Sequence, residues 1–290
     1  MNNNLKGEVN PLVFLKTSLF LTLLILAVIV EIVSLPILIV IWIICKRNSV
    51  VFRKASRIII GNGLYLLFSL DLRDFRKKLK QIKKSDNPRI YVINHSSIFD
   101  AILLFLIPDN IKILVKESYT KTPILGSIIK LNGHIVVKNS QNEEDGVEFY
   151  QNVVNQIKNG SVIAIFPEGT RSKDGNISRF KNGAFKIAYD TKSDIIPIVM
   201  DSWNIVRPSD GVWFRENKLY SKVLDTLHYE NYKNMEPRDL AKTLRKNMAT
   251  ELFNIRESRK QIQPRYYRNK EIFKEIDGVA KNKLEKTYIE

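Results

Sequence analysis

The chain has 290 residues, of which 44% are hydrophobic and 26% charged, a composition that excludes a fully disordered or fibrous protein. Its 46 lysines and arginines outnumber its 30 aspartates and glutamates, so the formal net charge is +16 at pH 7. Such a chain is attracted to nucleic acid, an anionic membrane surface or phosphorylated ligands. A single cysteine, Cys45, excludes a disulfide within the chain and a cysteine-based zinc site, and three scattered histidines give no indication of a metal cluster. This cysteine usage is typical of a reducing compartment.

The first predicted element is an apolar segment from Thr17 to Cys45, which contains one charged residue, Glu31, and one proline, Pro36. As a single helix its 29 residues would extend about 43 Å, longer than the roughly 30 Å hydrocarbon core of a bilayer. Two structures therefore remain open: one tilted transmembrane helix, or two short helices that bend near Glu31 and Pro36 and return to the cytoplasmic side. A cleaved signal peptide fits poorly, because the apolar segment is too long and basic residues follow it directly. We expect residues 1–50 to anchor the protein in a membrane.

A basic stretch follows, from Lys46 to Lys84, with twelve basic residues against two acidic ones. Basic residues beside an apolar segment hold that side of the chain in the cytoplasm and bind anionic headgroups. We therefore expect the remainder of the chain to lie on the cytoplasmic face of a membrane. Within this stretch, Ile58 to Leu70 is apolar enough to lie on the membrane or to pack on the main domain. A solvated basic linker is the alternative.

From Arg89 onward, short apolar runs alternate with helix-like stretches. The runs predict buried strands at Ile90–Ile93, Ile111–Val115, Ile135–Val137, Ser161–Phe166 and Ile195–Met200. The stretches between them predict helices at Phe99–Ile107, Pro123–Leu131, Glu143–Ile157 and Asn182–Tyr189, and a long amphipathic helix begins near Pro237. This alternation indicates an α/β fold with a largely parallel sheet flanked by helices. We predict one domain over residues 51–260, with its motifs in 89–200, followed by a basic polar tail over 261–290.

The first candidate site is NHSSIFD, Asn94 to Asp100, which follows a predicted strand. Active sites in parallel sheets gather at the carboxyl ends of strands, where His95 would lie. Asp100 would lie in the first turn of the next helix, whose N-terminus keeps the carboxylate ionised. A carboxylate bound to one imidazole nitrogen leaves the other nitrogen free to accept a proton. The alternative is an asparagine or serine that caps the helix beside a histidine without a chemical role.

The second candidate site is FPEGTRS, Phe166 to Ser172, at the end of another predicted strand. It combines a carboxylate, two hydroxyls and a guanidinium with a glycine that permits close backbone approach, namely Glu168, Thr170, Ser172, Arg171 and Gly169. This set suits a phosphorylated polyol, with Arg171 on the phosphate. A hydrogen-bonded surface turn is the alternative.

Together the two motifs resemble blocks I and III of the glycerolipid acyltransferases, a family that includes the 1-acylglycerol-3-phosphate O-acyltransferases. The resemblance covers residues 89–200 and extends through Lys116, Pro123 and Gly126 to GHIVVK (Gly133 to Lys138), which resembles block II, and to IIPIVM with Pro197, which resembles block IV. One departure is Lys138, where the family usually has arginine. Lysine keeps the charge but loses the bidentate geometry of arginine.

The resemblance implies transfer of a fatty acyl group from acyl-CoA or acyl carrier protein to the free hydroxyl of 1-acylglycerol 3-phosphate, giving phosphatidic acid for phospholipid synthesis. His95 would be the general base, and Asp100 would orient it. Substrate binding would involve Glu168, Gly169, Thr170, Arg171, Lys138 and Lys116. The resemblance implies no metal and no cofactor besides the thioester co-substrate. Consistently, the sequence contains no GxSxG, GxGxxG or Walker motif.

Two other functions remain open. An acyltransferase of the same scaffold that acts on glycerol 3-phosphate or on another lysolipid would carry similar motifs. A non-catalytic basic protein that binds phosphoinositides or nucleic acid would not depend on His95. The basic residues are densest beside the apolar segment and no recognisable RNA- or DNA-binding module is present, which favours a membrane surface over nucleic acid.

Overall fold

The computed structural model describes residues 73–80, 82, 86–97, 99–104, 107, 111–138, 142–203, 205 and 219–262, together with positions 11, 14, 15, 17–19, 22, 36, 40, 43 and 44. The apolar stretch 58–70, the tail beyond residue 262 and most of the predicted anchor lie outside these residues. The described positions between 11 and 44 are helical. In the parts of the chain that the structure describes, no single helix has both the length and the apolar character that crossing a bilayer requires.

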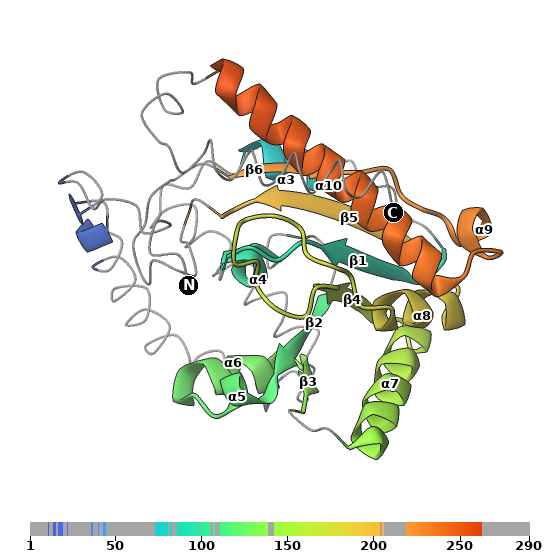
Figure 1. Cartoon of the computed structure of the whole chain (residues 1–290). Coiled ribbons are helices and arrows are strands. Elements are labelled where there is room, and N and C mark those ends of the chain that lie inside the picture. The colour runs from blue at the N-terminus through green and yellow to red at the C-terminus, as the bar shows by residue number, and fades with distance from the viewer. Residues whose placement is uncertain are drawn as a thin grey trace.

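A six-stranded sheet in the order β3-β2-β4-β1-β5-β6 forms the centre of the protein (Figure 1). Its parallel strands are β1 (Arg89–Ile93), β2 (Ile111–Lys116), β3 (Ile135–Val137), β4 (Val162–Ile165) and β5 (Asp194–Asp201). At one edge β6 (Tyr220–Val223) pairs antiparallel with β5. The predicted largely parallel sheet is confirmed, and each predicted strand is correct to within one residue at either end. The edge strand β6 was not predicted, because YSKV contains no apolar run.

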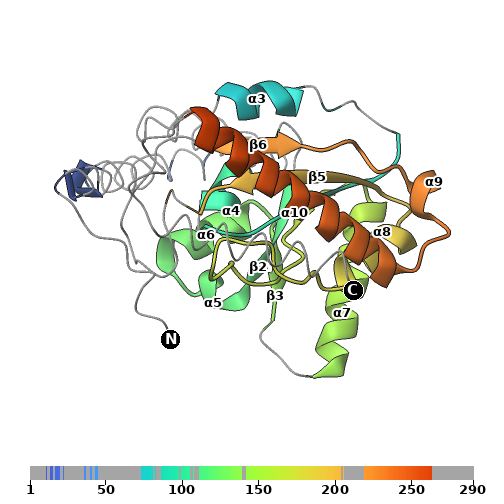
Figure 2. The same cartoon turned by 45° about the horizontal axis from the view of Figure 1, so that its top comes forward.

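Helices cover both faces of this sheet, and α10 crosses over β5 while α3 packs beside β6 (Figure 2). The helices are α3 (Arg73–Lys80), α4 (Phe99–Leu103), α5 (Glu117–Thr120), α6 (Pro123–Leu131), α7 (Glu143–Lys158), α8 (Gly183–Asp190), α9 (Tyr229–Tyr232) and α10 (Pro237–Ile262). The predictions for α6, α7, α8 and the start of α10 are confirmed. The prediction for α4 was four residues too long, because the Ile107 amide bonds the Leu104 carbonyl in a tighter turn and Pro108 follows.

The helix α3 argues against the alternative of a solvated basic linker in this part of the chain. Phe75 and Leu79 lie four residues apart on one helix face and are both buried, whereas Lys77 and Lys80 are exposed. The apolar pair packs into a core cluster that also contains Tyr91. This segment therefore belongs to the folded domain, although most of its residues are basic.

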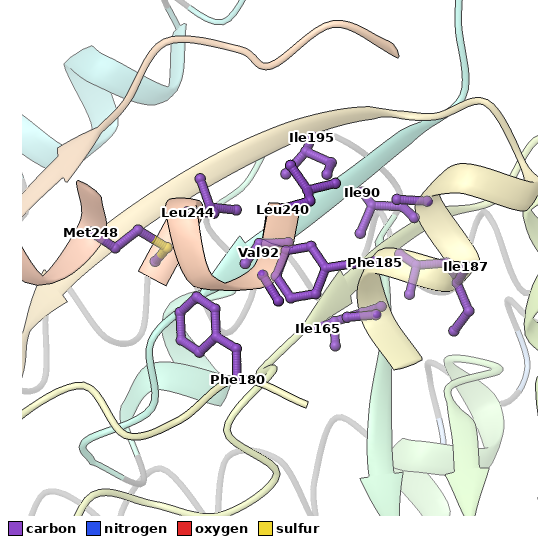
Figure 3. Close-up of a cluster of buried hydrophobic side chains, with 14 of the residues drawn as sticks. Ile90, Val92, Ile165, Phe180, Phe185, Ile187, Ile195, Leu240, Leu244 and Met248 are labelled. Carbon is purple, nitrogen blue, oxygen red and sulfur yellow. The ribbon is translucent and has the colours of Figure 1, made fainter. Parts of the chain in front are cut away.

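The central strand β1 is buried on both faces, as its uninterrupted apolar sequence predicts. Successive side chains of a strand point to opposite faces, so Tyr91 and Ile93 join one core cluster and Ile90 and Val92 join the other. Figure 3 shows the second cluster, in which Ile90 and Val92 lie among side chains of α8 and α10 that include Phe185. Packing on two sides fixes β1 and therefore the segment that follows it.

Candidate active site

The carboxyl ends of three neighbouring parallel strands bring the two motifs together. In the sheet β1 lies between β4 and β5; NHSSIFD follows β1 and FPEGTRS follows β4, while Ser202 follows β5. The side chain of Asn94 joins the end of β1 to β5 by two hydrogen bonds. Its amide nitrogen donates to the Met200 carbonyl at 2.9 Å, and its oxygen accepts from the Met200 amide at 2.8 Å. The predicted gathering of motifs at this edge of the sheet is therefore present (Figure 1).

His95 and Asp100 form a hydrogen-bonded pair. The Nδ1 atom of His95 lies 3.0 Å from Oδ2 of Asp100, which is fully buried in the first turn of α4. The amides of Ser96 and Ser97 donate to the same carboxylate oxygen at 2.6 and 2.8 Å. Because an ionised carboxylate only accepts, this hydrogen bond selects the neutral tautomer that carries its proton on Nδ1 and keeps a lone pair on Nε2. The imidazole is 19% exposed, so this nitrogen belongs to a ring that ligands can reach.

The other oxygen of Asp100 accepts a hydrogen bond from the hydroxyl of Ser202. The Ser202 hydroxyl also lies 2.9 Å from the hydroxyl of Ser96. Ser202 has one hydroxyl hydrogen, and its bond to the carboxylate uses that hydrogen, so Ser96 is the donor between the two serines. Sequence reasoning missed Ser202. Its signal was a polar residue just after a predicted strand.

The FPEGTRS segment holds His95 through its ring and through its backbone. The Phe166 ring stacks on the imidazole with centroids 4.2 Å apart. The His95 amide donates to Oε1 of Glu168 at 2.8 Å, and the Ser172 amide donates to the His95 carbonyl at 2.7 Å. Arg171 directly precedes Ser172, so the backbone of Arg171 lies near His95, and the Arg171 side chain is exposed.

Glu168 is 5% exposed and bridges two loops. Its Oε1 accepts from the His95 amide, and its Oε2 accepts from the Ser178 amide at 2.8 Å. Burial raises the pKa of Glu168 to about 7, although these hydrogen bonds act in the opposite direction. Both carboxylate oxygens are thus occupied by backbone donors of the protein itself.

Gly169 is required by the shape of its turn. Its φ angle is 71°, in the left-handed region that favours glycine, and a Cβ atom there would lie 2.8 Å from Nζ of Lys181. The lysine side chain therefore lies across the turn. Thr170, the next residue, is exposed.

The two predicted lysines lie at the ends of more distant strands. Lys116 ends β2 and Lys138 follows β3, which are two and three positions from β1 in the sheet, about 10 and 14 Å at the usual spacing. The Lys138 amine lies 2.8 Å from Asp145 and 3.2 Å from Glu148, and these hydrogen bonds raise its pKa. Among the residues described, no cluster of three histidine, cysteine or acidic side chains could hold a metal ion.

A buried ionic cluster lies directly beside the Ser202 segment. Asp201, the last residue of β5, accepts hydrogen bonds from Arg256 and Arg259 of α10. All three residues are at most 5% exposed. Burial alone would raise the pKa of Asp201, but the two guanidinium groups outweigh burial and hold the pKa below its usual range. Arg256 also donates to the Gly175 carbonyl at 2.7 Å, so α10 supports the loop after FPEGTRS as well.

Residues 74–201 match the family model for acyltransferases, and this span contains both motifs and the hydrogen-bonded pair. This part of the chain is therefore similar to the acyltransferase family. The structural unit extends beyond the matched span, because Ser202 and the two arginines of α10 bind residues of that span from outside it.

Proteins similar to this chain carry names that agree with the family match. The chain is 30% identical over 152 residues to the chloroplastic 1-acyl-sn-glycerol-3-phosphate acyltransferase BAT2 of Brassica napus, covering 52% of this chain and 43% of that protein. It is 28% identical over 194 residues to the 1-acyl-sn-glycerol-3-phosphate acyltransferase of Saccharomyces cerevisiae, covering 66% and 62%. The chain thus spans less than two thirds of the length of either relative.

A solved structure has the same fold. The 1-acyl-sn-glycerophosphate acyltransferase PlsC from Thermotoga maritima superimposes with a TM-score of 0.52 at 19% sequence identity. The match covers 79% of this chain and 97% of that chain.

Proposed function

We propose that this protein transfers a fatty acyl group from an acyl thioester to the free hydroxyl of 1-acylglycerol 3-phosphate, giving phosphatidic acid. The observation that carries the proposal is the His95 imidazole, held through Nδ1 by Asp100 at 3.0 Å, in an acyltransferase domain. The names of the relatives supply the acceptor. Either acyl-CoA or acyl carrier protein can supply the thioester.

In this mechanism Nε2 of His95 takes the proton of the acceptor hydroxyl as that oxygen attacks the thioester carbonyl. Collapse of the tetrahedral intermediate breaks the carbon–sulfur bond, and the imidazolium returns the proton to the leaving thiolate. Asp100 keeps Nδ1 protonated and stabilises the imidazolium. The reaction needs no enzyme nucleophile, and it uses no metal or cofactor besides the thioester.

We further propose that Arg171 binds the acceptor phosphate. The hydrogen bond from Ser172 to the His95 carbonyl keeps Arg171 beside the base, and a guanidinium matches phosphate geometry. Lys116 is the nearer of the two lysines in the sheet, whereas Lys138 would have to leave two ion pairs to reach a ligand. Glu168 then serves to position the two motif loops, since backbone donors occupy both of its oxygens.

Replacing Arg171 with alanine should raise the KM for the lysolipid by roughly 10- to 150-fold, because a charge-assisted contact contributes about 1.5–3 kcal/mol. The KM for the thioester should change far less. Steady-state kinetics with each substrate varied in turn measure both constants. Arg238→Ala, at an exposed arginine in the first turn of α10, is the matched control and should leave both constants unchanged. A rise in the thioester KM alone would assign the loop to the donor.

The acceptor is tested by supplying the purified full chain with glycerol 3-phosphate, 1-acylglycerol 3-phosphate and other lysolipids in competition, with acyl-CoA and acyl carrier protein as alternative donors. Product identity by mass spectrometry should show phosphatidic acid as the main product. Preferential acylation of glycerol 3-phosphate or another lysolipid would support the first alternative. Tight phospholipid binding without acyl transfer to any acceptor would support the non-catalytic alternative.

We also propose that residues 1–50 attach the protein to the cytoplasmic face of a membrane and that the adjoining basic stretch binds anionic headgroups. At the described helical positions near the N-terminus, six large apolar side chains are between 53% and 72% exposed to solvent, namely Phe14, Leu15, Leu19, Val40, Ile43 and Ile44. Exposed apolar side chains of this kind are stabilised by burial in a lipid phase.

Membrane fractions are expected to retain the full chain in 1 M salt and to release it in detergent. Apolar burial survives high salt, whereas attraction between charges is screened when the Debye length falls to about 3 Å. Sedimentation followed by immunoblotting measures the released fraction. Complete release by salt alone would show that the attachment is electrostatic and would contradict an apolar anchor.

A further inference from the structure

We propose that Ser202 is a positioning residue that fixes the Asp100 carboxylate in the orientation from which it holds His95, and that α10 keeps Ser202 in place. This inference rests on the proposed role of His95 as general base. It adds to the two motifs a residue that lies just outside the 74–201 span of the family match.

The hydrogen bonds around Asp100 show why the hydroxyl matters. One carboxylate oxygen accepts from three donors, the Nδ1 of His95 and the amides of Ser96 and Ser97. The only donor described for the other oxygen is the Ser202 hydroxyl. A hydrogen bond to the second oxygen restricts rotation of the carboxylate about its χ2 bond more than hydrogen bonds to one oxygen alone. Ser202 therefore controls the direction in which Asp100 presents its lone pairs.

The position of Ser202 is itself determined by buried contacts. Its side chain is completely buried, and the Ser96 hydroxyl donates to it from the loop that carries the histidine. The preceding residue, Asp201, accepts from both Arg256 and Arg259 across 55 and 58 residues of chain. Arg259 also lies over the Tyr220 ring, with 4.2 Å from its guanidinium carbon to the ring centroid. The two arginines of α10 thus fix the position of the end of β5, and Ser202 follows that end directly.

A displaced carboxylate affects the chemical step more than binding. Misplacement of a catalytic group by about 1 Å costs on the order of 100-fold in rate. Ser202→Ala should therefore lower kcat by about 10- to 100-fold. The KM values for lysolipid and thioester should change by less than about 3-fold, since no contact of Ser202 with Arg171 is described.

Ser221→Ala is the matched control. Ser221 is a buried serine on the neighbouring strand β6, and no hydrogen bond of its hydroxyl is found among the described residues. The same chemical change there should leave kcat unchanged. Equal losses in the two variants would show that removal of any buried hydroxyl in this region disturbs the fold, and the inference would be overturned.

Ser202→Cys separates the hydrogen bond from the shape of the side chain. Cysteine has nearly the same shape as serine, but its thiol is a weak donor. A loss of kcat close to that of Ser202→Ala is expected. Full activity in the cysteine variant would mean that filled volume matters rather than the hydroxyl, which would contradict the proposal.

The tautomer of His95 provides a readout that does not depend on turnover. The chain has only three histidines, so ¹⁵N-histidine labelling of the full chain in detergent gives few signals, and His95→Ala assigns those of His95. The neutral wild-type ring should be almost entirely protonated at Nδ1, and Ser202→Ala should show a mixture of tautomers. An unchanged tautomer together with an unchanged kcat would overturn the inference. Absence of acyl transfer by the wild-type protein would instead reject the proposed function, and the tautomer would still test Ser202.

Discussion

Substituting His95 with alanine is expected to lower turnover by about two to four orders of magnitude, the usual contribution of a general base. Asp100 holds the His95 imidazole through Nδ1, and solvent reaches this ring. Alanine has no group that can accept the proton of the acceptor hydroxyl. The fold should survive, because the backbone bonds of residue 95 to Glu168 and Ser172 do not involve the imidazole. Rates of phosphatidic acid formation, together with circular dichroism of the purified variant, measure both outcomes.

His228 offers a control of the same residue type at the opposite end of the sheet. It also pairs through Nδ1 with a buried aspartate, at 2.9 Å from Asp194, but Asp194 begins β5 whereas His95 follows the end of β1. His228→Ala should retain near wild-type turnover. Near-normal turnover in His95→Ala would exclude His95 as the base and would require another proton acceptor near the FPEGTRS loop.

Substituting Asp201 with asparagine is expected to lower the free energy of unfolding by about 3–5 kcal/mol, because it removes the negative charge that Asp201 supplies to two buried guanidinium groups. Asparagine keeps the size of the side chain, so lost packing is not the cause. Urea unfolding of the full chain in detergent, followed by tryptophan fluorescence, measures the change. Asp225→Asn, at an exposed aspartate after β6, should change the value by no more than about 0.5 kcal/mol.

The Asp201 cluster also has a predictable pH dependence. The pKa of Asp201 is lower in the folded protein than the ordinary value of 3.8, so the folded state favours the ionised carboxylate. The contribution to stability is therefore present above pH 3.8 and is lost as the pH falls through the lower pKa of the folded state. The stability difference between wild type and Asp201→Asn should shrink on acidification through this range. A stability difference that stays the same at every pH would show that the charge of the Asp201 carboxylate is not the source of the stabilisation.

The parallel sheet was predictable because its strands are buried on both faces and appear in the sequence as continuous apolar runs, as in Ile90–Ile93 and Ile195–Met200. The elements that were missed have weaker signals. In α3, basic residues surround the buried pair Phe75 and Leu79, and in β6 the sequence alternates between a partly buried tyrosine, a buried serine and an exposed lysine. Tertiary packing decides the structure of such segments, and local pattern does not.

The hydrogen-bonded pair was predictable because His95 and Asp100 are close in sequence and a single turn brings them together. The supports of that pair come from residues far apart in sequence. Ser202 lies 102 residues after Asp100, and Glu168 lies 73 residues after His95. In the sequence, the carboxylate of Glu168 in FPEGTRS suggests a contact with a ligand. In the structure, its two oxygens instead accept hydrogen bonds from the amides of His95 and Ser178. Long-range partners of this kind depend on the strand order, which local sequence does not specify.

The ion pairs between Asp201 at the end of β5 and the two arginines of α10 have a consequence for synthesis of the protein. Ribosomes extend a chain at about 5–20 residues per second, so Arg256 is added about 3 to 11 s after Asp201. During that interval the nascent chain already contains His95, Asp100 and Ser202, but the carboxylate of Asp201 has neither arginine to neutralise it. The ion pairs that hold the end of β5 can therefore form only after α10 has left the ribosome. Residues 1–50, which we propose to attach the protein to a membrane, emerge long before this step and would reach the lipid surface while the end of β5 still lacks these ion pairs.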